Sequence, residues 1–293
     1  MNIAAFEAFL KVMETGSISM AAEKLFITQP AVSKRIQSLE QFFNVRLFDS
    51  VGRNIQPTKA AERLLPQVQQ WMNQLEDMHR DLSQSQTNIA GKLKIGTSHH
   101  IGLHHLAKQL QPFAQQYPQV ELDVHFVDSE QALQLVLSGE IELAFLTLPP
   151  KPDPRLQHRV LWNDPLSFVV APFHALAQQQ QLSLESLIAY PSLLPASNTY
   201  TSQITLAAFS KYGLKPHASM STNPLESIRM LVSIGLGWSV LPQTLINEDL
   251  CILDLDVQLE RQLGIVWHPD RSQSKAMQSL LNQLERLNDL HGE

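Results

Sequence analysis

The chain has 293 residues, which is more than one small domain needs and suits two or three domains. Hydrophobic residues make up 44% and charged residues 17%, so the sequence can bury sizeable cores and excludes global disorder. A net charge of −6 excludes a uniformly basic nucleic-acid binder. Residues 1–60 nevertheless carry 7 basic and 5 acidic groups, against 15 and 23 in the rest of the chain. A mildly basic head on an acidic body is typical of a modular DNA binder.

The single cysteine, Cys251, excludes a disulfide framework and fits a reducing cytosol, so we expect a cytoplasmic protein. Its neighbours Ile252 and Leu253 indicate that it is a small buried hydrophobe. Residues 1–17 have no basic start and include Glu7, which argues against a secretory signal. No run of about 18 apolar residues exists, so we expect no membrane contact.

The N-terminus has the pattern of short, closely spaced helices. Apolar residues recur at helical spacing over residues 3–13, and Gly16 is free to end this helix in a left-handed conformation. Ser19 is expected to cap a second short helix over residues 20–25.

A third helix is predicted over residues 28–43, with Thr28 as its cap and Pro30 in its first turn. One side is an apolar stripe and faces the core. The opposite face has no carboxylate, and its side chains suit base edges and phosphates. This face carries Gln29, Pro30, Ser33, Lys34, Gln37 and Gln41.

Residues 47–48 and 54–55 predict two short strands that form a wing. From Thr58 onward, apolar residues recur in steps of three and four over more than twenty residues, which is typical of a dimerising helix. A helix packed on its own domain has a similar pattern. Pro66 predicts a kink in this helix, and the polar residues 83–88 predict a hinge.

Strands and helices alternate in the remainder of the chain. Their order over residues 93–146 predicts a parallel sheet. A second series begins with a strand at residues 166–171, and the chain closes with a strand at 263–267 and a helix at 274–290. Two α/β halves of this kind resemble the type 2 periplasmic-binding-protein architecture, in which the last strand and helix return to the first half.

Two motifs carry a resemblance to a known family. Residues 16–25 read GSISMAAEKL and residues 28–33 read TQPAVS, followed by Leu47 and Phe48. Residues 235–242 read GLGWSVLP. The first stretch closely resembles the signature of LysR-type transcriptional regulators, and the second resembles a weaker marker in their effector domain. The chain departs from the family's usual residues at Ser50, Pro57 and Ala61.

The resemblance implies an α/β effector part behind a largely helical winged helix-turn-helix. The implied domains are a DNA-binding domain over residues 1–58, a linker and dimerisation helix with hinge over 59–88, and an effector-binding domain over 89–293. Within the effector-binding domain we expect subdomain I to comprise residues 89–162 and 266–293, and subdomain II to comprise residues 163–265.

The resemblance also implies that the third helix reads double-stranded promoter or operator DNA at an interrupted inverted repeat, within a homodimer or homotetramer. The resemblance is also compatible with a contact between the protein and RNA polymerase. Gln can pair with adenine, and Pro can contact a thymine methyl group. The expected DNA-binding residues are Thr28, Gln29, Pro30, Ser33, Lys34 and Arg53.

The effector site is expected in the crevice between the α/β halves, at the carboxyl ends of strands. The loops there are rich in hydroxyl and amide groups, contain no Lys or Arg, and precede helices whose free N–H groups favour an anion. We therefore expect a small polar or anionic metabolite, although the same hydroxyls could simply cap the helices. The expected effector-binding residues are Thr97, Ser98, His99, Ser129, Thr147, Asn198, Thr199, Tyr200 and Asn223.

Four histidines lie at residues 99–105. His100 and His104 are four apart and could share one helical face, a spacing that metal sites use. No Cys or carboxylate close by in the sequence completes a tetrahedral set, so we predict no metal site and no cofactor, and interpret the histidines as a surface or cleft cluster.

Two other functions compete with DNA-binding regulation. A soluble small-molecule binding protein without a DNA role would use only the α/β part, and the 60-residue head and the missing signal sequence argue against it. An enzyme would need a catalytic constellation, and the sequence contains no GxxxxGK[ST], GxSxG or HExxH motif, so we expect no catalysis.

Overall fold

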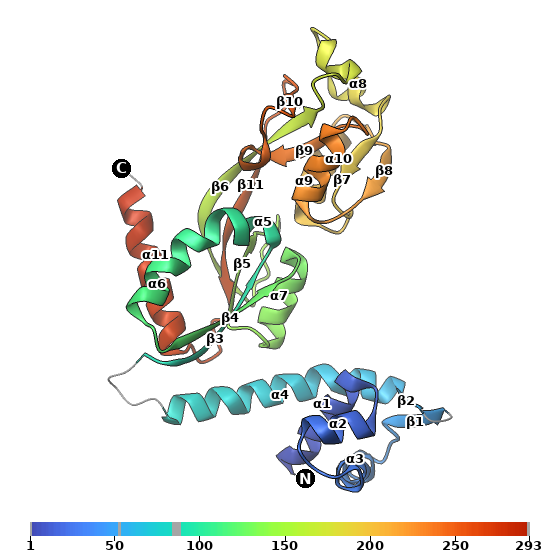
Figure 1. Ribbon diagram of the computed structural model, residues 1–293, viewed down its shortest axis with the longest axis vertical. Coiled ribbons are helices and arrows are strands. Elements are labelled where there is room, and N and C mark those ends of the chain that lie inside the picture. Colours follow the sequence, from blue (N-terminus) through green and yellow to red (C-terminus); the bar gives the residue numbers. More distant parts are fainter. Residues whose placement is uncertain (1, 52–53, 84–88, 292–293) are drawn as a thin grey trace. The chain divides into compact units, whose positions relative to one another are not determined.

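The computed structural model describes residues 2–51, 54–83 and 89–291, and the chain divides after residue 84 into two compact units (Figure 1). Apart from Ser83, the predicted hinge lies outside the described residues. The N-terminal unit contains α1 (Ile3–Thr15), α2 (Ile18–Lys24), α3 (Gln29–Phe43), β1 (Phe48–Val51), β2 (Asn54–Pro57) and α4 (Lys59–Ser83).

The three N-terminal helices pack around small and aromatic side chains. Ala8, Ala21 and Ala22 are buried and let the helices approach closely, while Phe9 and Leu39 fill the core between them. Burial of this apolar surface stabilises the unit, because helices as short as α2 are not stable alone.

One predicted helix start is wrong. The helix α2 begins at Ile18, because Ser17 has the extended conformation of a cap and its hydroxyl accepts a hydrogen bond from the N–H of Met20 at 3.4 Å. Ser19, the expected cap, lies inside the helix.

The turn between α2 and α3 is tight. Phe26 occupies it with a φ of 53°, in the left-handed region, and its side chain is 95% exposed. This conformation is costly for a bulky side chain. The packing of the helices on either side holds the turn in this conformation. Two backbone hydrogen bonds support it, from Phe26 N–H to the carbonyl of Glu23 and from Ile27 N–H to the carbonyl of Ala22.

The predicted wing is present as an antiparallel pair of β1 and β2, and both strands are longer than expected. Its base is tied to α3 by Glu40, whose Oε1 accepts hydrogen bonds from the backbone N–H of Leu47 at 2.7 Å and of Phe48 at 3.3 Å. Thr58 closes the wing, since its N–H donates to the carbonyl of Leu47 at 2.9 Å.

The helix α4 continues past Pro66 as one element. Its first half packs on its own unit, because Ala61 and Val68 are buried in the N-terminal core. Further along, the apolar side chains on its surface are exposed: Trp71, Leu75 and Met78. The first half of α4 is therefore a helix packed on its own domain, and the dimerising role of the second half stays a prediction.

The C-terminal unit alternates strands and helices. Its elements are β3 (Gly91–Thr97), α5 (His99–Ile101), the π-helix η1 (Gly102–Leu106), α6 (Ala107–Gln116), β4 (Val120–Phe126), α7 (Ser129–Ser138), β5 (Leu143–Thr147), β6 (Gln157–Val170), η2 (Ala175–Gln178), α8 (Leu184–Ile188), β7 (Ser192–Leu194), α9 (Tyr200–Ser210), β8 (Ala218–Ser221), α10 (Leu225–Ser233), β9 (Ser239–Pro242), η3 (Gln243–Leu245), β10 (Cys251–Ile252), β11 (Leu259–Trp267) and α11 (Lys275–His291). Within the described residues, every helix is too short or too polar to span a bilayer.

The first half of this unit is a three-layer sandwich. β3 pairs in parallel with β4 and with β5, as predicted, and β11 pairs antiparallel with β5. Alternate residues of β5 face opposite sides: Leu143 and Phe145 pack under α6 and α11, and Ala144 and Leu146 pack under α7. Burial on both faces explains why β5 is apolar throughout.

The second half repeats this alternation on strand β6. Phe168 and Val170 pack toward α8, α9 and Trp238, while Val169 packs toward α10. Trp238 anchors the core, because its ring stacks on Phe209 and its Nε1–H donates to the carbonyl of Leu187 at 2.9 Å.

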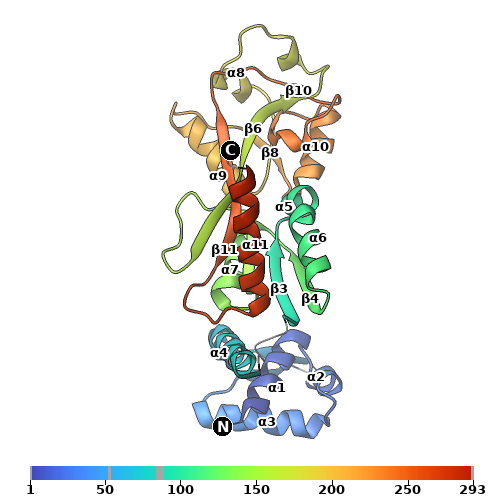
Figure 2. The ribbon, with the colours of Figure 1, turned by 90° about the vertical axis from the view of Figure 1, so that its left-hand side faces the viewer.

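The two halves are joined by β6 and β11, which pair antiparallel from Leu259 with Leu166 to Trp267 with Gln157 (Figure 2). Both strands begin earlier than predicted, at residues 157 and 259 instead of 166 and 263. The additional residues of β6 are mostly exposed or half-buried, and those of β11 alternate between buried and exposed. Neither segment has the long apolar run on which the sequence prediction relied.

Cys251 differs from its prediction. Its side chain packs at the edge of the second core but is only half-buried, because β10 is a two-residue edge strand paired with β6.

Candidate functional site

The exposed face of α3 starts at its first turn. Thr28 is the cap residue by position, but its hydroxyl makes no capping bond to the helix. Gln29, Pro30 and Lys34 are exposed, and Ser33 is half-buried. Pro30 is tolerated because the first helical N–H groups have no partner inside the helix. This face of α3 therefore presents hydrogen-bond donors and acceptors that another molecule can reach.

Two lysines of the N-terminal unit, Lys11 and Lys24, form ion pairs within that unit. The carboxylate of Glu14 lies 2.5 Å from Lys11 Nζ and 2.7 Å from Lys24 Nζ, which ties α1 to α2. These two ammonium groups lower the pKa of Glu14 to about 2. Arg53, the sixth predicted DNA contact, lies outside the described residues.

A small cavity of about 60 Å³ lies where the N-termini of α5, α7, α9 and α10 meet strand β11. We call it the helix-end cavity. Helix N-termini carry unpaired N–H groups and a partial positive charge, so their convergence favours an anion. Six of the predicted effector residues line it: Ser98, His99, Ser129, Thr147, Thr199 and Asn223.

Three predicted effector residues do not line the cavity. Thr97 is fully buried, and its hydroxyl donates to the carbonyl of Ser98. The side chain of Asn198 is exposed. Tyr200 contributes its backbone N–H to a nearby carboxylate, while burial, together with Glu130 and Asp153, raises the pKa of its phenol to about 12.

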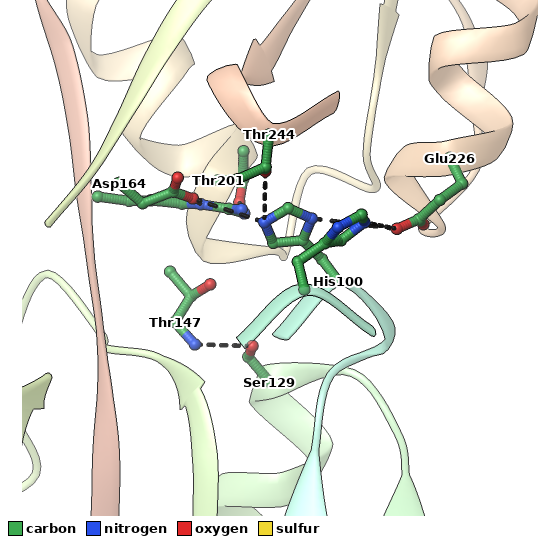
Figure 3. Close-up of polar contacts among 9 residues, drawn as sticks. His100, Ser129, Thr147, Asp164, Thr201, Glu226 and Thr244 are labelled. Carbon is green, nitrogen blue, oxygen red and sulfur yellow. Dashed lines mark hydrogen bonds and ion pairs between the residues drawn. The ribbon is translucent and has the colours of Figure 1, made fainter. Parts of the chain in front are cut away.

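Several lining hydroxyl and amide groups already serve the fold. Thr199 Oγ1 accepts from Ser202 N–H and donates to the carbonyl of Ala196, so it is a helix cap. Ser129 Oγ accepts from Thr147 N–H at 3.1 Å, which leaves the Ser129 hydroxyl proton to donate (Figure 3). The hydroxyl of Ser98 makes no capping bond to α5. Ser98 and Ser129 are therefore the hydroxyls best suited to a ligand.

A cationic side chain that the sequence analysis missed also lines the cavity. Arg261 on β11 is 4% exposed, and its Nε donates to Asp164 Oδ2 at 2.7 Å while one terminal nitrogen donates to Thr201 Oγ1 at 2.9 Å. Its other terminal nitrogen, Nη2, is buried and has no hydrogen-bond partner among the described residues. Burial lowers the pKa of Arg261, and Asp164 opposes this shift. A buried, unpaired guanidinium N–H favours a negatively charged or polar ligand.

Two acidic side chains that line the cavity, those of Asp128 and Glu130, bond to groups of the other half. Asn223 Nδ2 donates to Asp128 Oδ2 at 2.5 Å, and Asn223 Oδ1 accepts from Ala196 N–H. Tyr200 N–H donates to Glu130 Oε1 at 2.6 Å. Burial raises the pKa of Glu130, although the Tyr200 bond opposes the shift. Both carboxylates are thus satisfied by groups from the opposite half of the unit.

The histidines form a cluster beside the same cavity. His100 is buried, and burial together with the charge of Arg261 lowers its pKa to about 2, so its ring is neutral. Burial also lowers the pKa of His105, whose ring lies 4.9 Å from that of Trp162. Glu226, at the start of α10, comes within 3.5 Å of His104. The carboxylate missing from the local sequence therefore comes from the other half.

A second, larger cavity of about 440 Å³ lies on the other side of β11. Its lining mixes apolar and proline side chains, such as Leu148 and Ile204, with polar and charged ones, among them Asp153, Glu260 and Arg261. None of the predicted effector residues is among the described residues that line it. The helix-end cavity is smaller but carries the convergent polar groups that define a recognition site.

The sequence contained one signal for Arg261. Along β11, Leu259, Arg261 and Leu263 are buried and alternate with exposed residues. A charged residue in phase with two leucines on the buried face of a strand indicates a paired or ligand-binding charge. The pairing of Arg261 with Asp164 and Thr201 has no such local signal, because it depends on strand register.

Two family models together match most of the chain. Residues 3–62 match "Bacterial regulatory helix-turn-helix protein, lysR family", and residues 86–288 match "LysR substrate binding domain". Among curated relatives, the HTH-type transcriptional activator CmpR of Synechocystis is 28% identical over 286 residues, covering 95% of this chain and 93% of CmpR. An uncharacterized HTH-type transcriptional regulator of Azotobacter vinelandii is 50% identical over 106 residues, covering 36% of this chain and 74% of that protein.

Solved structures share the fold. A full-length single-residue variant of OxyR from Pseudomonas aeruginosa matches with a TM-score of 0.70 and 19% identity, covering 97% of each chain. Full-length CbnR in complex with its target DNA matches with a TM-score of 0.69 and 16% identity, covering 98% of this chain and 99% of CbnR. At these identities the likeness concerns the fold.

Proposed function

Because the chain belongs to the LysR family of bacterial transcriptional regulators, we propose that a small anionic effector in the helix-end cavity controls how α3 engages an operator. Family membership makes the chain a DNA-binding transcriptional regulator with an effector-binding domain.

The unpaired Nη2 of Arg261 is the observation that carries the effector's chemistry. A carboxylate or phosphate oxygen would satisfy it and could also accept bonds from Ser98 and Ser129. The net +1 charge of Arg261 is balanced by Asp164, so the remaining selectivity for an anion comes from the helix N-termini. The cavity of about 60 Å³ is well below the roughly 300–1,000 Å³ of drug-sized sites, which favours a small effector or one that opens the halves.

Hydrogen bonds between the two halves beside the helix-end cavity suggest how the effector acts. The pairs of Asp128 with Asn223 and of Glu130 with the N–H of Tyr200 join the two halves beside the cavity. An effector that opens or tightens the halves changes these contacts, and only such differential binding can shift a conformational equilibrium.

On the DNA side, we assign Gln29, Pro30 and Ser33 to base edges, and Thr28 and Lys34 to phosphates. Arg53 is retained as a wing contact. The target is an interrupted inverted repeat, because a two-fold dimer presents two copies of α3. The exposed apolar residues Trp71, Leu75 and Met78 of α4 are the proposed seam with a second copy of this chain.

Further parts of the proposal follow from the family. We assign the chain a dimeric or tetrameric assembly, a contact with RNA polymerase, a cytoplasmic location and a role without catalysis. We also keep the boundaries 1–58, 59–88 and 89–293 for its domains, with the subdomain division at residues 162/163 and 265/266.

The test compares two cavity-filling variants of the full chain. Small mono- and dicarboxylates and sugar phosphates are screened by thermal shift, and hits are measured by calorimetry. Ser98→Phe fills the helix-end cavity and should abolish binding, whereas Ile204→Phe fills the larger cavity and should leave it unchanged. The opposite pattern would move the effector site to the larger cavity, and a screen without any anion hit would overturn the proposed chemistry.

A further inference from the structure

A cluster of metal-ligating side chains adjoins the helix-end cavity, which His100 also lines, and the proposed effector contacts do not use it. We propose that His100, His104 and Glu226 together bind one divalent transition-metal ion, such as Zn²⁺, between the two halves of the C-terminal unit. Two imidazoles and one carboxylate form a ligand set that such ions accept, with water in a fourth position.

The distances are close to those of a formed site. Each residue offers one ligand atom, and these atoms all lie within 4.8 Å of one another. His104 Nε2 lies 3.5 Å and His100 Nδ1 lies 4.0 Å from Glu226 Oε1 (Figure 3). Bonds of about 2.0–2.1 Å in a tetrahedron place ligand atoms roughly 3.3 Å apart, so an ion requires them to move together by no more than about 1.5 Å.

Two of the three ligand atoms are buried without a hydrogen-bond partner. They are His100 Nδ1 and Glu226 Oε1, which have no hydrogen-bond partner among the described residues. The contacts of Glu226 Oε1 with His104 Nε2 and His100 Nδ1 are ion-pair distances of 3.5 and 4.0 Å. The side chain of His100 is 4% exposed, so water does not reach it freely. Burying unsatisfied polar atoms costs free energy, and an ion placed between them would satisfy both.

The second ring nitrogen of His100 has the partners that a metal-bound histidine needs. His100 Nε2 lies 3.4 Å from Thr244 Oγ1 and 3.8 Å from Asp164 Oδ2. Such outer groups fix the ring's orientation and tautomer, and so direct the lone pair of the other nitrogen at the ion. A proton on Nε2 would place that lone pair on Nδ1, which lies 4.0 Å from Glu226 Oε1.

The local backbone also fits a built site. His104 lies on η1, the π-helical segment Gly102–Leu106 within an otherwise α-helical run. Such widened turns occur frequently at functional sites. The wider turn changes the angle between positions 100 and 104 around the helix axis, and the rings of His100 and His104 lie 4.9 Å apart.

The charge balance favours a cation. Asp164 already pairs with Arg261, so the carboxylate that faces the two imidazoles is that of Glu226. Glu226 therefore brings a negative charge to the cluster. A divalent ion would compensate this charge.

The ion would link the two halves. Both histidines belong to the helical run after β3, whereas Glu226 belongs to α10. Occupancy would stabilise the arrangement in which these elements meet, and so would act on the same halves as the proposed effector. This last consequence depends on the proposed function, whereas binding of the ion does not.

The experiment titrates the chelator-treated full chain with Zn²⁺ alone, and with Co²⁺ as a spectroscopic probe. We expect one ion per chain, a visible Co²⁺ spectrum of low coordination number and a higher melting temperature. His104→Gln and Glu226→Gln should each weaken the affinity roughly 100-fold, and Thr244→Val roughly 10-fold. Both ligand positions are partly exposed, so these variants should fold.

The matched control is His125→Gln, which removes a histidine 3.2 Å from a carboxylate of Asp123 on another part of the unit. It should leave the affinity and stoichiometry unchanged. The proposal is overturned if Zn²⁺ does not bind, or if binding survives in both His104→Gln and Glu226→Gln. The measurement needs no effector or DNA, so it fails or succeeds independently of the proposed regulation.

Discussion

Arg261 and Asp164 are direct cross-strand neighbours on β11 and β6, and they form a buried ion pair with 2.7 Å between Nε and Oδ2. Both side chains are about 95% buried. Burying such a pair costs the desolvation free energy of both charges, and their mutual attraction compensates for this cost only while both partners are present. It also holds the guanidinium at the cavity wall, where Nη2 remains available.

Breaking this pair should destabilise the chain strongly. Asp164→Asn removes the negative charge and leaves the buried guanidinium of Arg261 without its ion-pair partner, and we expect a loss of about 3–5 kcal/mol in unfolding free energy. The double change Asp164→Leu with Arg261→Met, which removes both charges, should recover most of that loss. Urea unfolding of the full chain measures both. A loss below about 1 kcal/mol in Asp164→Asn would mean that the pair is hydrated.

The pH dependence of stability should report on Glu130. Burial raises its pKa in the folded chain above the ordinary value of 4.5. The protonated form is therefore favoured by folding, and its contribution is full below about pH 4.5 and is lost as the pH rises through the raised value.

The variant Glu130→Gln keeps a neutral acceptor for the N–H of Tyr200. It should be more stable than the wild type at about pH 7 and nearly equal to it at about pH 4, in unfolding by urea. Glu248→Gln, at an exposed position, is the control and should show no such difference. An equal effect of Glu130→Gln at both pH values would contradict the burial argument.

The left-handed residue in the helix-turn-helix offers a stabilising change. Phe26 has a φ of 53° and contributes almost no buried surface. Asn tolerates this conformation better, so Phe26→Asn should raise the unfolding free energy by about 0.5–1 kcal/mol. Phe42→Asn replaces another exposed phenylalanine, but inside a right-handed helix, and should not stabilise. Thermal unfolding compares the two variants.

Two residues of α3 should differ in what they contribute to DNA binding. Lys34→Ala should weaken binding to all DNA sequences. It should also reduce the slope of the logarithm of the binding constant against the logarithm of the salt concentration by about 1, as expected for a phosphate contact. Gln29→Ala should cost about 1–3 kcal/mol on the cognate operator and much less on unrelated DNA.

Fluorescence anisotropy at several salt concentrations, with operator and scrambled duplexes, separates these effects. Lys211→Ala removes an exposed lysine of the other unit and is the control for net charge. If Lys34→Ala changed only the operator affinity, Lys34 would be reassigned to base recognition.

Local patterns determined much of this protein. The helical spacing up to Phe43, the short strands of the wing and the alternation of strands and helices after residue 88 each depend on neighbours in the sequence, and the structure has all three. The motif around Gln29 and Pro30 identified the family for the same reason, because the helix-turn-helix is a contiguous segment. Small errors arose where two local cues competed, as with Ser17 and Ser19 at the start of α2.

The tertiary structure alone decided how the cavity is completed. Arg261 meets Asp164 through the register of two strands that are 97 residues apart in sequence, and Glu226 meets His104 through the packing of α10 on the other half. Neither partner is near the other in sequence, and both strands extend through segments that lack an apolar run. Charge pairing across such separations depends on the positions of whole elements, so the sequence could indicate the polar loops that line the cavity but not the charged side chains that meet there.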